Sequence, residues 1–592
     1  MTSNSTPAKT RPPGLIRLFV AYLQPYRPRV IAVILLAAVD AAASFWLPTL
    51  NADIIDNGVL TGDTAHILDT GRYMALAAFL IVASSIATLY IGIGIAASVA
   101  RDIRRDLYTH SIGLSAHEYN RFTAASLITR TTSDITQIQN LAFAIVTVGV
   151  TAPLMAVAGL SFAISANLPL SVVFLIAIPV LAGTVFFIQR AMRTVSRLNQ
   201  ERIDAVNGIV REHISGIRVI RAFARDKHER ERFRTANTEL SGVGLRMGRI
   251  QALFGATLGL VVNLATAGIV WIGSGLVTGG DLQVGQMISF IAYLALIVQA
   301  IMMGMSVFMQ WPRARVAGER IAEVLRTTPA ITYPTNADCE NASRTGSTVA
   351  FDGVSFRYPG AEDDVVSNID FIAPEGKTTA IVGSTGSGKS TLVKLMPRLY
   401  DPDSGTVTIG ETDIRDLTRD ELSDLVGYVP QKAFLFTGTI AENMRYGSAS
   451  ATEEEIWRAL RTAGAADFVT NMPDGLNTLI GQGGMTVSGG QRQRLAIARA
   501  LLSDAAILIF DDSFSALDTA TDAAVRNALD TDLHGVTRII VAQRISTIRD
   551  ADRIIVLDKG RIADIGTHDA LIAASTVYAE IVSSQLALED SK

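Results

Sequence analysis

The chain is poor in cysteine and in charged residues. Cys339 is the single cysteine among 592 residues, which excludes an intramolecular disulfide and a cysteine-rich metal site. Charged residues make up 18% of the chain, whereas soluble proteins carry about 25%. The net charge is -4, so the composition carries no global signature of nucleic-acid binding. Because the shortage of charge is concentrated in the first half, it indicates membrane spans there.

Long stretches without charge predict six membrane spans in the first half of the chain. A membrane helix needs about 20 apolar residues. No charged residue occurs in 73–100 or in 141–189, and the second stretch is long enough for two spans that separate at residues 167–169. The other predicted spans cover 31–50, 250–280 and 282–310.

The distribution of arginine and lysine predicts that both termini lie in the cytosol. Cytoplasmic loops of membrane proteins carry an excess of these residues. Arginines stand before the first span, after the second and after the fourth, whereas the opposite loops, 51–72 and 274–283, contain Arg72 alone. The predicted cytosolic connections, roughly 101–140 and 190–249, are polar with a helical period, so they continue the spans beyond the membrane.

The start of the chain predicts a cytosolic lead. Residues 1–14 are polar, contain prolines and lack the apolar core of a signal peptide, so we expect them to be disordered. We expect the lead to cover 1–29, ahead of a six-span domain over 30–325.

Two features inside the spans leave open which side chains line a transport pathway. Asp40 interrupts the first span, and acids in membranes usually face a bundle interior or an aqueous cavity. A cavity-lining role and a structural hydrogen-bonding role are equally open for it. The sixth span carries four methionines, which suit adaptable binding surfaces and also fill helix interfaces; the interface role is favoured. They are Met302, Met303, Met305 and Met309.

From about residue 346 the sequence changes to short apolar runs that alternate with helical stretches. This pattern predicts an α/β domain over 346–592, reached through a linker over 326–345. The strand candidates are VAFDGVSFRY, TTAIVG, VTIG, VGYVP, AILIF, RIIVA and RIIVLD.

The stretch GSTGSGKST, residues 383–391, matches a phosphate-binding loop. Its glycines let backbone N–H groups wrap phosphates at the start of a helix, Lys389 is expected to reach the β- and γ-phosphates, and Ser390 can ligate Mg²⁺. Asp511 ends the strand candidate AILIF and is the expected carboxylate on the metal side. We therefore predict that ATP and Mg²⁺ bind at Gly383, Ser384, Thr385, Gly386, Ser387, Gly388, Lys389, Ser390 and Thr391.

The order of these motifs resembles that of the nucleotide-binding domain of ABC transporters, and the six preceding spans resemble the exporter architecture. The resemblance implies an all-α membrane domain followed by a cytosolic α/β P-loop ATPase domain. It implies that Tyr358 in FRYPG stacks on adenine, and that Gln431 in YVPQ ligates the metal and links the site to the membrane domain. The segments 122–139 and 215–229 resemble the cytosolic connections that carry the family's coupling helices.

The signature VSGGQRQRL, residues 487–495, implies a dimer. In this family each ATP is held between the phosphate loop of one chain and the signature of the other. A helix that opens with SGGQ offers a hydroxyl and backbone N–H donors to a γ-phosphate. The sequence SALD ending at Asp518 matches the loop that crosses the dimer. The residues that this resemblance adds to the ATP site are Ser488, Gly489, Gly490, Gln491 and Asp518.

Three departures from the family pattern predict slow hydrolysis. Asp512 stands where a glutamate usually polarises the attacking water, and a misplacement by one C–C bond can cost about 10²-fold in rate. Adjustment of the backbone is the alternative. Gln543 replaces a histidine that contacts the γ-phosphate. A glutamine amide can donate a hydrogen bond there, but it does not take up a proton and so carries no positive charge. Gln482 replaces a glutamate that is common in the interdomain loop. The catalytic candidates are Asp512 and Gln543, which depart from the family pattern, and Gln431, which matches it.

These observations favour the degenerate half of a heterodimeric exporter. Its own site would hydrolyse ATP slowly, while its intact signature completes the site of a second half-transporter. The resemblance implies export of amphipathic drugs or lipids across the plasma membrane. The alternatives are a homodimer with two slow sites, an ATP-sensing regulatory subunit, and an importer of metal chelates.

Overall fold

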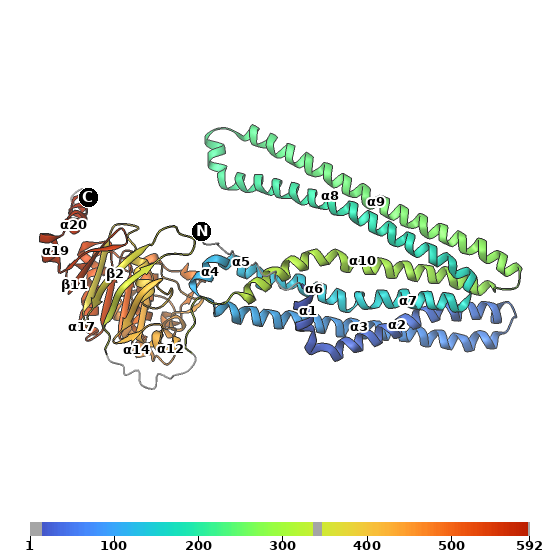
Figure 1. Cartoon of the computed structure of the whole chain (residues 1–592), viewed down its shortest axis with the longest axis horizontal. Helices are drawn as coiled ribbons and strands as arrows, with labels where there is room; N and C mark the ends of the chain where they lie inside the picture. Colours follow the sequence, from blue (N-terminus) through green and yellow to red (C-terminus); the bar gives the residue numbers. More distant parts are fainter. Residues whose placement is uncertain (1–14, 335–345, 590–592) are drawn as a thin grey trace, which may run out of the picture. The chain divides into compact units, whose positions relative to one another are not determined.

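The computed structural model describes residues 15–334 and 346–589, which fall into two compact units (Figure 1). The first unit contains the membrane helices, residues 1–112 and 125–327, and the second contains residues 113–124 and 328–592. The lead over 1–14 and Cys339 lie outside the described residues.

Six helical segments in the described part of the first unit are long and apolar enough to cross a membrane, as predicted. The predicted separation at 167–169 is a break between two helices, where the Asn167 side chain accepts a hydrogen bond from the Leu170 N–H at 3.0 Å. The segments are built from α2 (Arg27–Asp53), η2 (Ile54–Val59), α3 (Thr64–Ile112), α5 (Ala124–Thr129), η3 (Arg130–Asp134), α6 (Ile135–Val146), α7 (Val148–Ala166), α8 (Leu168–Ala222), α9 (Asp226–Thr278) and α10 (Val284–Arg326).

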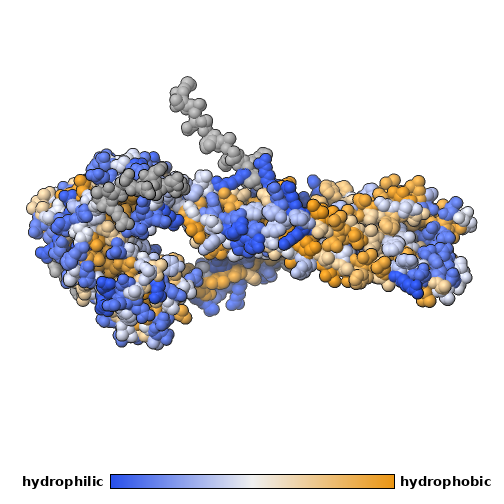
Figure 2. Space-filling view, turned by 90° about the horizontal axis from the view of Figure 1, so that it is seen from below, coloured by the Kyte–Doolittle hydropathy of each residue, from blue (hydrophilic) through white to orange (hydrophobic). Residues whose placement is uncertain are grey.

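The surface of the helical unit carries the hydropathy pattern of a membrane protein. Figure 2 shows hydrophobic residues gathered over the middle of this unit, between hydrophilic stretches. Large apolar side chains there face outward, and Trp271 is 82% exposed. Helices α8 and α9 run side by side (Figure 1) and their polar halves form the second predicted connection.

Part of the predicted lead is helical. Residues 15–23 form α1 (Leu15–Leu23), followed by the short helix η1 (Gln24–Tyr26). Leu15 and Phe19 are buried, and Leu15 packs against Gly318 of α10. This segment belongs to the helical unit because its apolar face is covered by the membrane helices.

Asp40 is held by the neighbouring span. Its Oδ1 accepts hydrogen bonds from the hydroxyls of Ser85, at 2.8 Å, and Ser84, at 3.3 Å, both on α3. These contacts supply the hydrogen bonds of a structural role, and a cavity-lining role stays a prediction. Of the four methionines on α10, Met309 is 61% exposed and the others are partly exposed.

The second unit is built on a six-stranded sheet in the order β12-β11-β3-β10-β9-β6, with a smaller antiparallel sheet in the order β2-β1-β4-β5 and a pair β7-β8. All the predicted strands form, whereas β2, β5, β7, β8 and β12 were not among the strand candidates. The strands are β1 (Val349–Phe356), β2 (Val366–Ala373), β3 (Thr378–Gly383), β4 (Ser404–Ile409), β5 (Thr412–Asp413), β6 (Val426–Val429), β7 (Gly438–Thr439), β8 (Leu479–Ile480), β9 (Ile507–Asp511), β10 (Thr537–Val541), β11 (Arg553–Asp558) and β12 (Arg561–Gly566).

Helices and two buried clusters enclose the six-stranded sheet. Ala380 and Val382 of β3 belong to one cluster and Ile381 to the other, as the alternation of side chains along a strand requires. The helices are α4 (Ala116–Phe122), α11 (Lys389–Leu395), α12 (Arg419–Leu425), α13 (Ile440–Arg445), α14 (Glu453–Thr462), α15 (Ala466–Thr470), η4 (Gly475–Asn477), η5 (Gln482–Gly484), α16 (Gly489–Leu501), α17 (Thr519–Asp532), α18 (Ile545–Ile548), α19 (His568–Ala574) and α20 (Thr576–Glu589).

The parallel strands bring four separate segments to one edge of the sheet. Strands β3, β10, β9 and β6 are parallel neighbours, and their registers pair Val541 with Asp511 and Val429 with Phe510. In open α/β sheets ligands bind outside the carboxyl ends of the strands. The phosphate loop, Gln431, Asp512 and Gln543 therefore converge, although they are far apart in the sequence.

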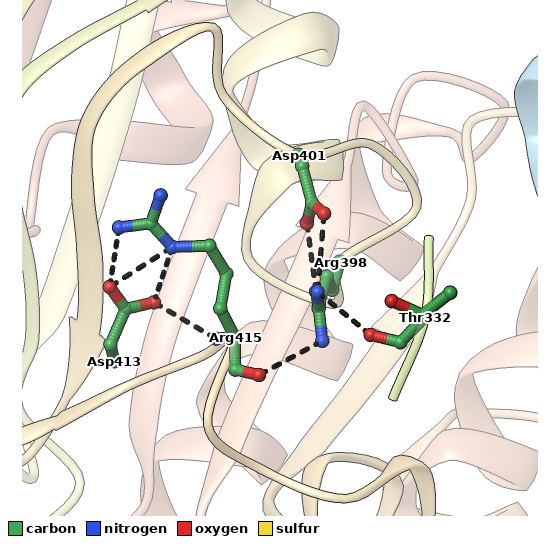
Figure 3. A network of polar contacts seen from close by, with 5 residues as sticks. All are labelled: Thr332, Arg398, Asp401, Asp413 and Arg415. Carbon is green, nitrogen blue, oxygen red and sulfur yellow. Dashed lines mark hydrogen bonds and ion pairs between the residues drawn. The ribbon is translucent and has the colours of Figure 1, made fainter. Parts of the chain in front are cut away.

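A buried arginine fastens the chain segment that enters the second unit. Arg398 is 5% exposed and donates hydrogen bonds to the carbonyl oxygen of Thr332 and to the carboxylate of Asp401 (Figure 3). It also donates to the carbonyl oxygen of Arg415, whose side chain is paired with Asp413 (Figure 3). The Arg398 guanidinium and its carboxylate partner thus hold residues 332–333 against the unit.

Candidate functional site

The phosphate loop has the backbone conformation that its sequence predicts. Gly386 and Gly388 have φ of 85° and 97°, a region that favours glycine. A Cβ at Gly388 would also lie 2.7 Å from a methyl carbon of Val366. Helix α11 begins at the next residue, Lys389, so the loop turns its backbone N–H groups toward a phosphate position.

Lys389 is buried within this loop. Its Nζ donates to the carbonyl oxygens of Gly383 and Ser384, both at 2.7 Å, and the residue is 9% exposed. Burial lowers the pKa of Lys389, although Asp512 and Asp511 partly oppose that shift. A cation held here, next to a loop of N–H donors, favours a ligand with several negative charges.

Asp511 and Ser390 form a pair of oxygen ligands beside the loop. The Ser390 hydroxyl donates to Asp511 Oδ1 at 2.8 Å, and the Tyr428 hydroxyl donates to Asp511 Oδ2 at 3.1 Å. Mg²⁺ prefers one or two carboxylates together with hydroxyl, water and phosphate oxygens, and this donor set fits it. Tyr428 is absent from the predicted site; the sequence signal for it is its place in the strand candidate VGYVP, three residues before Gln431.

Asp512 is buried between two side-chain amides. Its Oδ2 accepts one hydrogen bond from Gln431 Nε2 and one from Gln543 Nε2, both at 2.9 Å. Burial raises the pKa of Asp512, with a further increase from the neighbouring Asp511, whereas the hydrogen bond from Gln431 opposes the increase. Gln431 and Gln543 therefore donate to the same carboxylate oxygen of Asp512.

These residues line a cavity of about 260 Å³ at the carboxyl edge of the sheet. It brings most of the phosphate loop together with Asp512, Gln431 and Gln543. The lining residues are Val365, Thr385, Gly386, Gly388, Lys389, Ser390, Thr391, Gln431, Asp512, Val541 and Gln543.

Tyr358 lies in a cluster of aromatic rings. Its ring meets those of Phe356 and Tyr400 edge-on, with centroid distances of 5.0 and 5.3 Å, and its hydroxyl lies 3.2 Å from the Thr391 hydroxyl. The contact with Thr391 places Tyr358 beside the phosphate loop. The Tyr400 hydroxyl in turn accepts a hydrogen bond from Asn120 Nδ2 of α4 at 3.0 Å.

Ser488 and Gly489 of the signature are exposed, Gly490 and Gln491 are half-buried, and all four lie outside the lining of this cavity. Ser488 caps α16 in a reciprocal pair with Gln491, so the start of the helix is ordered. Asp518 likewise caps α17 by accepting from the Thr521 N–H at 2.9 Å. Nothing lies close to Gly489, whereas a Cβ at Gly490 would lie 3.2 Å from the carbonyl oxygen of Ala516, so the start of α16 is open at Ser488 and Gly489.

The fold and this site define a multi-pass membrane protein with an ATP-binding domain, and comparisons identify its family. Residues 30–301 match the ABC transporter transmembrane region, and residues 366–515 match the ABC transporter family. The chain belongs to the ABC transporter family. Its architecture is that of an ABC exporter half-transporter, a class that acts as a dimer in the membrane and couples ATP hydrolysis to transport.

Similar proteins cover almost the whole chain. An uncharacterized ABC transporter ATP-binding protein of Mycobacterium tuberculosis is 43% identical over 96% of this chain and 98% of its own length. An ATP-dependent lipid A-core flippase of Nitrosococcus oceani is 32% identical over 98% and 97%. The structure of a bacterial Atm1-family ABC exporter with ATP bound superposes with a TM-score of 0.78 at 26% identity, covering 94% of this chain and 99% of the other.

Proposed function

We propose that the chain is one half of a heterodimeric exporter whose own site binds ATP and hydrolyses it slowly. The observation that carries this proposal is the environment of Asp512, whose short carboxylate accepts from Gln431 and Gln543 on the same oxygen. Both donors are neutral amides. Position 543 therefore adds no positive charge to that of Lys389 beside the γ-phosphate, whereas a histidine there could.

The residues that would bind ATP form a coherent set. Tyr358 would stack on adenine, and the loop from Gly383 to Thr391 with Lys389 would hold the phosphates. Ser390 and Asp511 would hold Mg²⁺, with the side-chain oxygen of Gln431 as a further ligand. The metal neutralises charge on the phosphates when it is bound. Asp512 would orient the attacking water, from a position one methylene further back than a glutamate reaches.

The intact signature supports an unequal pair. Ser488, Gly489, Gly490 and Gln491 stand at the start of an ordered helix, with the first two exposed and the others half-buried, and they would complete the ATP site of a partner chain. A partner with glutamate and histidine at the positions of Asp512 and Gln543 would then hydrolyse ATP quickly. The site on this chain would mainly hold the dimer closed.

An amphipathic compound or a lipid is the cargo class that we propose. The similarity to a lipid A-core flippase supports this class, as does the hydrophobic surface of the helical unit. The arginine distribution supports a plasma-membrane orientation with both termini in the cytosol. Uptake of the amphipathic cargo into inside-out vesicles would support export. Loss of a metal chelate from vesicles loaded with it would support the alternative, import of a metal chelate.

The decisive experiment compares ATP turnover of the full chain in lipid nanodiscs, alone and with a second half-transporter that carries glutamate and histidine at these positions. We expect low turnover alone and a large increase in the pair. The double substitution Asp512→Glu with Gln543→His should raise turnover of the chain alone, by up to about 10²-fold. The two single substitutions are the matched controls, and each should recover less than the pair of substitutions.

Two outcomes would replace the proposal. Full turnover of the chain alone, with no gain from the double substitution, would make Asp512 a working catalytic carboxylate in a homodimeric pump. A transported compound that cross-links to the partner chain alone would make this chain an ATP-sensing regulatory subunit.

A further inference from the structure

One side chain far along the sequence holds the segment that carries Gln543. Gln585, on α20, accepts a hydrogen bond from the Ile545 N–H on its Oε1 at 2.8 Å. Its Nε2 donates to the carbonyl oxygen of Gln543. The side-chain amide of Gln585 therefore makes one hydrogen bond to a backbone N–H and one to a backbone carbonyl of residues 543–545, as neighbouring β-strands do.

Helix α20 is anchored, so Gln585 is presented from a fixed support. Tyr578 is fully buried, and its hydroxyl lies 2.7 Å from His568 Nδ1. Ile581 and Val582 pack against the same core. The spacing 578, 581, 582 and 585 places these residues on one face of the helix, so the face that docks α20 also carries the amide.

The opposite side of residues 543–545 is also tied down. The Arg544 guanidinium donates to the carbonyl oxygens of Leu517, at 3.1 Å, and Ser515, at 3.3 Å, in the segment that follows Asp512. Residues 543–545 are thus held between that segment and α20. From this position the Gln543 side chain reaches Asp512 and lines the cavity.

We propose that Gln585 is a positioning residue for ATP hydrolysis, which fixes the backbone of Gln543 so that its amide stays at Asp512 and the γ-phosphate position. The inference rests on the proposed role of Gln543, and the contacts that carry it lie within this chain. A purely structural role is the alternative, because the Ile545 N–H opens α18 and the side chain of Arg544 does not cap that helix. The two roles differ in their effect on turnover.

The test uses the full chain in nanodiscs with Gln585→Ala, and with Ser584→Ala as the matched control. Ser584 is the exposed neighbour of Gln585 on α20, and its hydroxyl bonds only within that helix. Loss of one neutral hydrogen bond, about 1 kcal/mol, corresponds to a change of about fivefold in a rate constant. We expect kcat to fall by about that factor in Gln585→Ala with an unchanged KM for ATP, and no change in Ser584→Ala.

Hydrogen exchange supplies a direct readout of the contact. The Ile545 amide should exchange about fivefold faster in Gln585→Ala than in the control. Gln585→Glu keeps the acceptor for that amide and loses the donor to Gln543, so it should protect the amide and still lower kcat. Faster exchange with an unchanged kcat would overturn the positioning role, and unchanged exchange would overturn the contact itself.

A second background separates this inference from the proposed function. In chains that carry Gln543→Ala, we expect Gln585→Ala to have no further effect on kcat, because the side chain that it positions is gone. An equal further loss of kcat would overturn the inference. If Gln543→Ala alone leaves kcat unchanged, the proposed role of Gln543 fails together with the inference; if Gln543→Ala lowers kcat and Gln585→Ala does not, the inference fails alone.

Discussion

At the scale of single residues, the backbone of Asp512 explains why this position tolerates an aspartate. Its φ is 51°, in the left-handed region, where aspartate and asparagine are several-fold enriched over other non-glycine residues. The Asp512 backbone is held in this conformation in part by its carbonyl oxygen, which accepts from the Ser515 hydroxyl at 2.8 Å. Such strained positions cluster at active sites, where the surrounding structure maintains them.

The raised pKa of Asp512 predicts a pH-dependent gain of stability in Asp512→Asn. A folded-state pKa above the usual 3.8 means that the acid contributes stability below the unfolded pKa, which is lost as the pH rises through the folded value. At neutral pH the folded domain therefore bears a buried charge that asparagine removes, while its oxygen still accepts from Gln431. We expect a higher Tm for Asp512→Asn at pH 7, measured by thermal unfolding of the full chain.

The difference in Tm should shrink as the pH is lowered toward the unfolded pKa, because the aspartate then becomes neutral. Asp363→Asn is the control, since Asp363 is exposed in the loop between β1 and β2 and its replacement should leave Tm unchanged at every pH. An equal Tm for Asp512→Asn and the unmodified chain at pH 7 would show that burial of the charge costs nothing measurable.

At the scale of elements, the short helix α4 is hydrogen-bonded to the aromatic cluster beside the expected adenine position. Asn120 bonds to Tyr400, whose ring contacts Tyr358, and the Glu118 carboxylate accepts from the Ala330 N–H at 3.2 Å. Burial raises the pKa of Tyr400, with a contribution from Tyr358, so its hydroxyl stays protonated at neutral pH. A segment between two membrane helices thus contacts the ring next to the expected adenine position.

Tyr400→Phe should loosen α4 without removing the ring that supports Tyr358. One lost hydrogen bond is worth about 1 kcal/mol, so the amides of 116–122 should exchange about fivefold faster. Hydrogen exchange of the full chain measures this effect. Tyr119→Phe is the matched control, because it removes a hydroxyl from a tyrosine that is 41% exposed on α4 itself. Equal exchange in both variants would mean that the bond between Asn120 and Tyr400 does not hold the helix.

Local patterns predicted the elements far better than the contacts between them. The phosphate loop, the strand that ends at Asp511 and the break at 167–169 each carry their signal in adjacent residues. Gln585 lies 42 residues beyond Gln543, and Arg398 lies 66 residues beyond Thr332, so no local pattern connects either pair. Helix α1 lies within the predicted lead over 1–29, and no local pattern shows that its buried face packs against the membrane helices.

At the scale of the whole molecule, one phosphate loop and one signature per chain determine how variants should complement each other. In a dimer of two identical copies, each ATP would contact Lys389 of one copy and Ser488 of the other. Co-expression of Lys389→Ala chains with Ser488→Arg chains would then restore one intact site in mixed dimers. In a heterodimer with another protein, the two variants never meet in one assembly.

We therefore expect no recovery of ATP turnover when the two variants are co-expressed and purified through different tags. The control is co-expression of the unmodified chain with each variant, which measures how efficiently tagged copies associate. Turnover in the mixed preparation above that of either variant alone would establish a homodimer and would set aside the unequal pair.

The anchoring of α20 also bears on how this transporter is handled in the laboratory. Helix α20, which presents Gln585, extends to Glu589, so a purification tag or fluorescent protein fused after Lys592 would be attached three residues beyond the helix that contacts residues 543–545. Turnover values from such fusions would report the attachment as well as the enzyme. A tag placed before residue 15 is not attached next to α20.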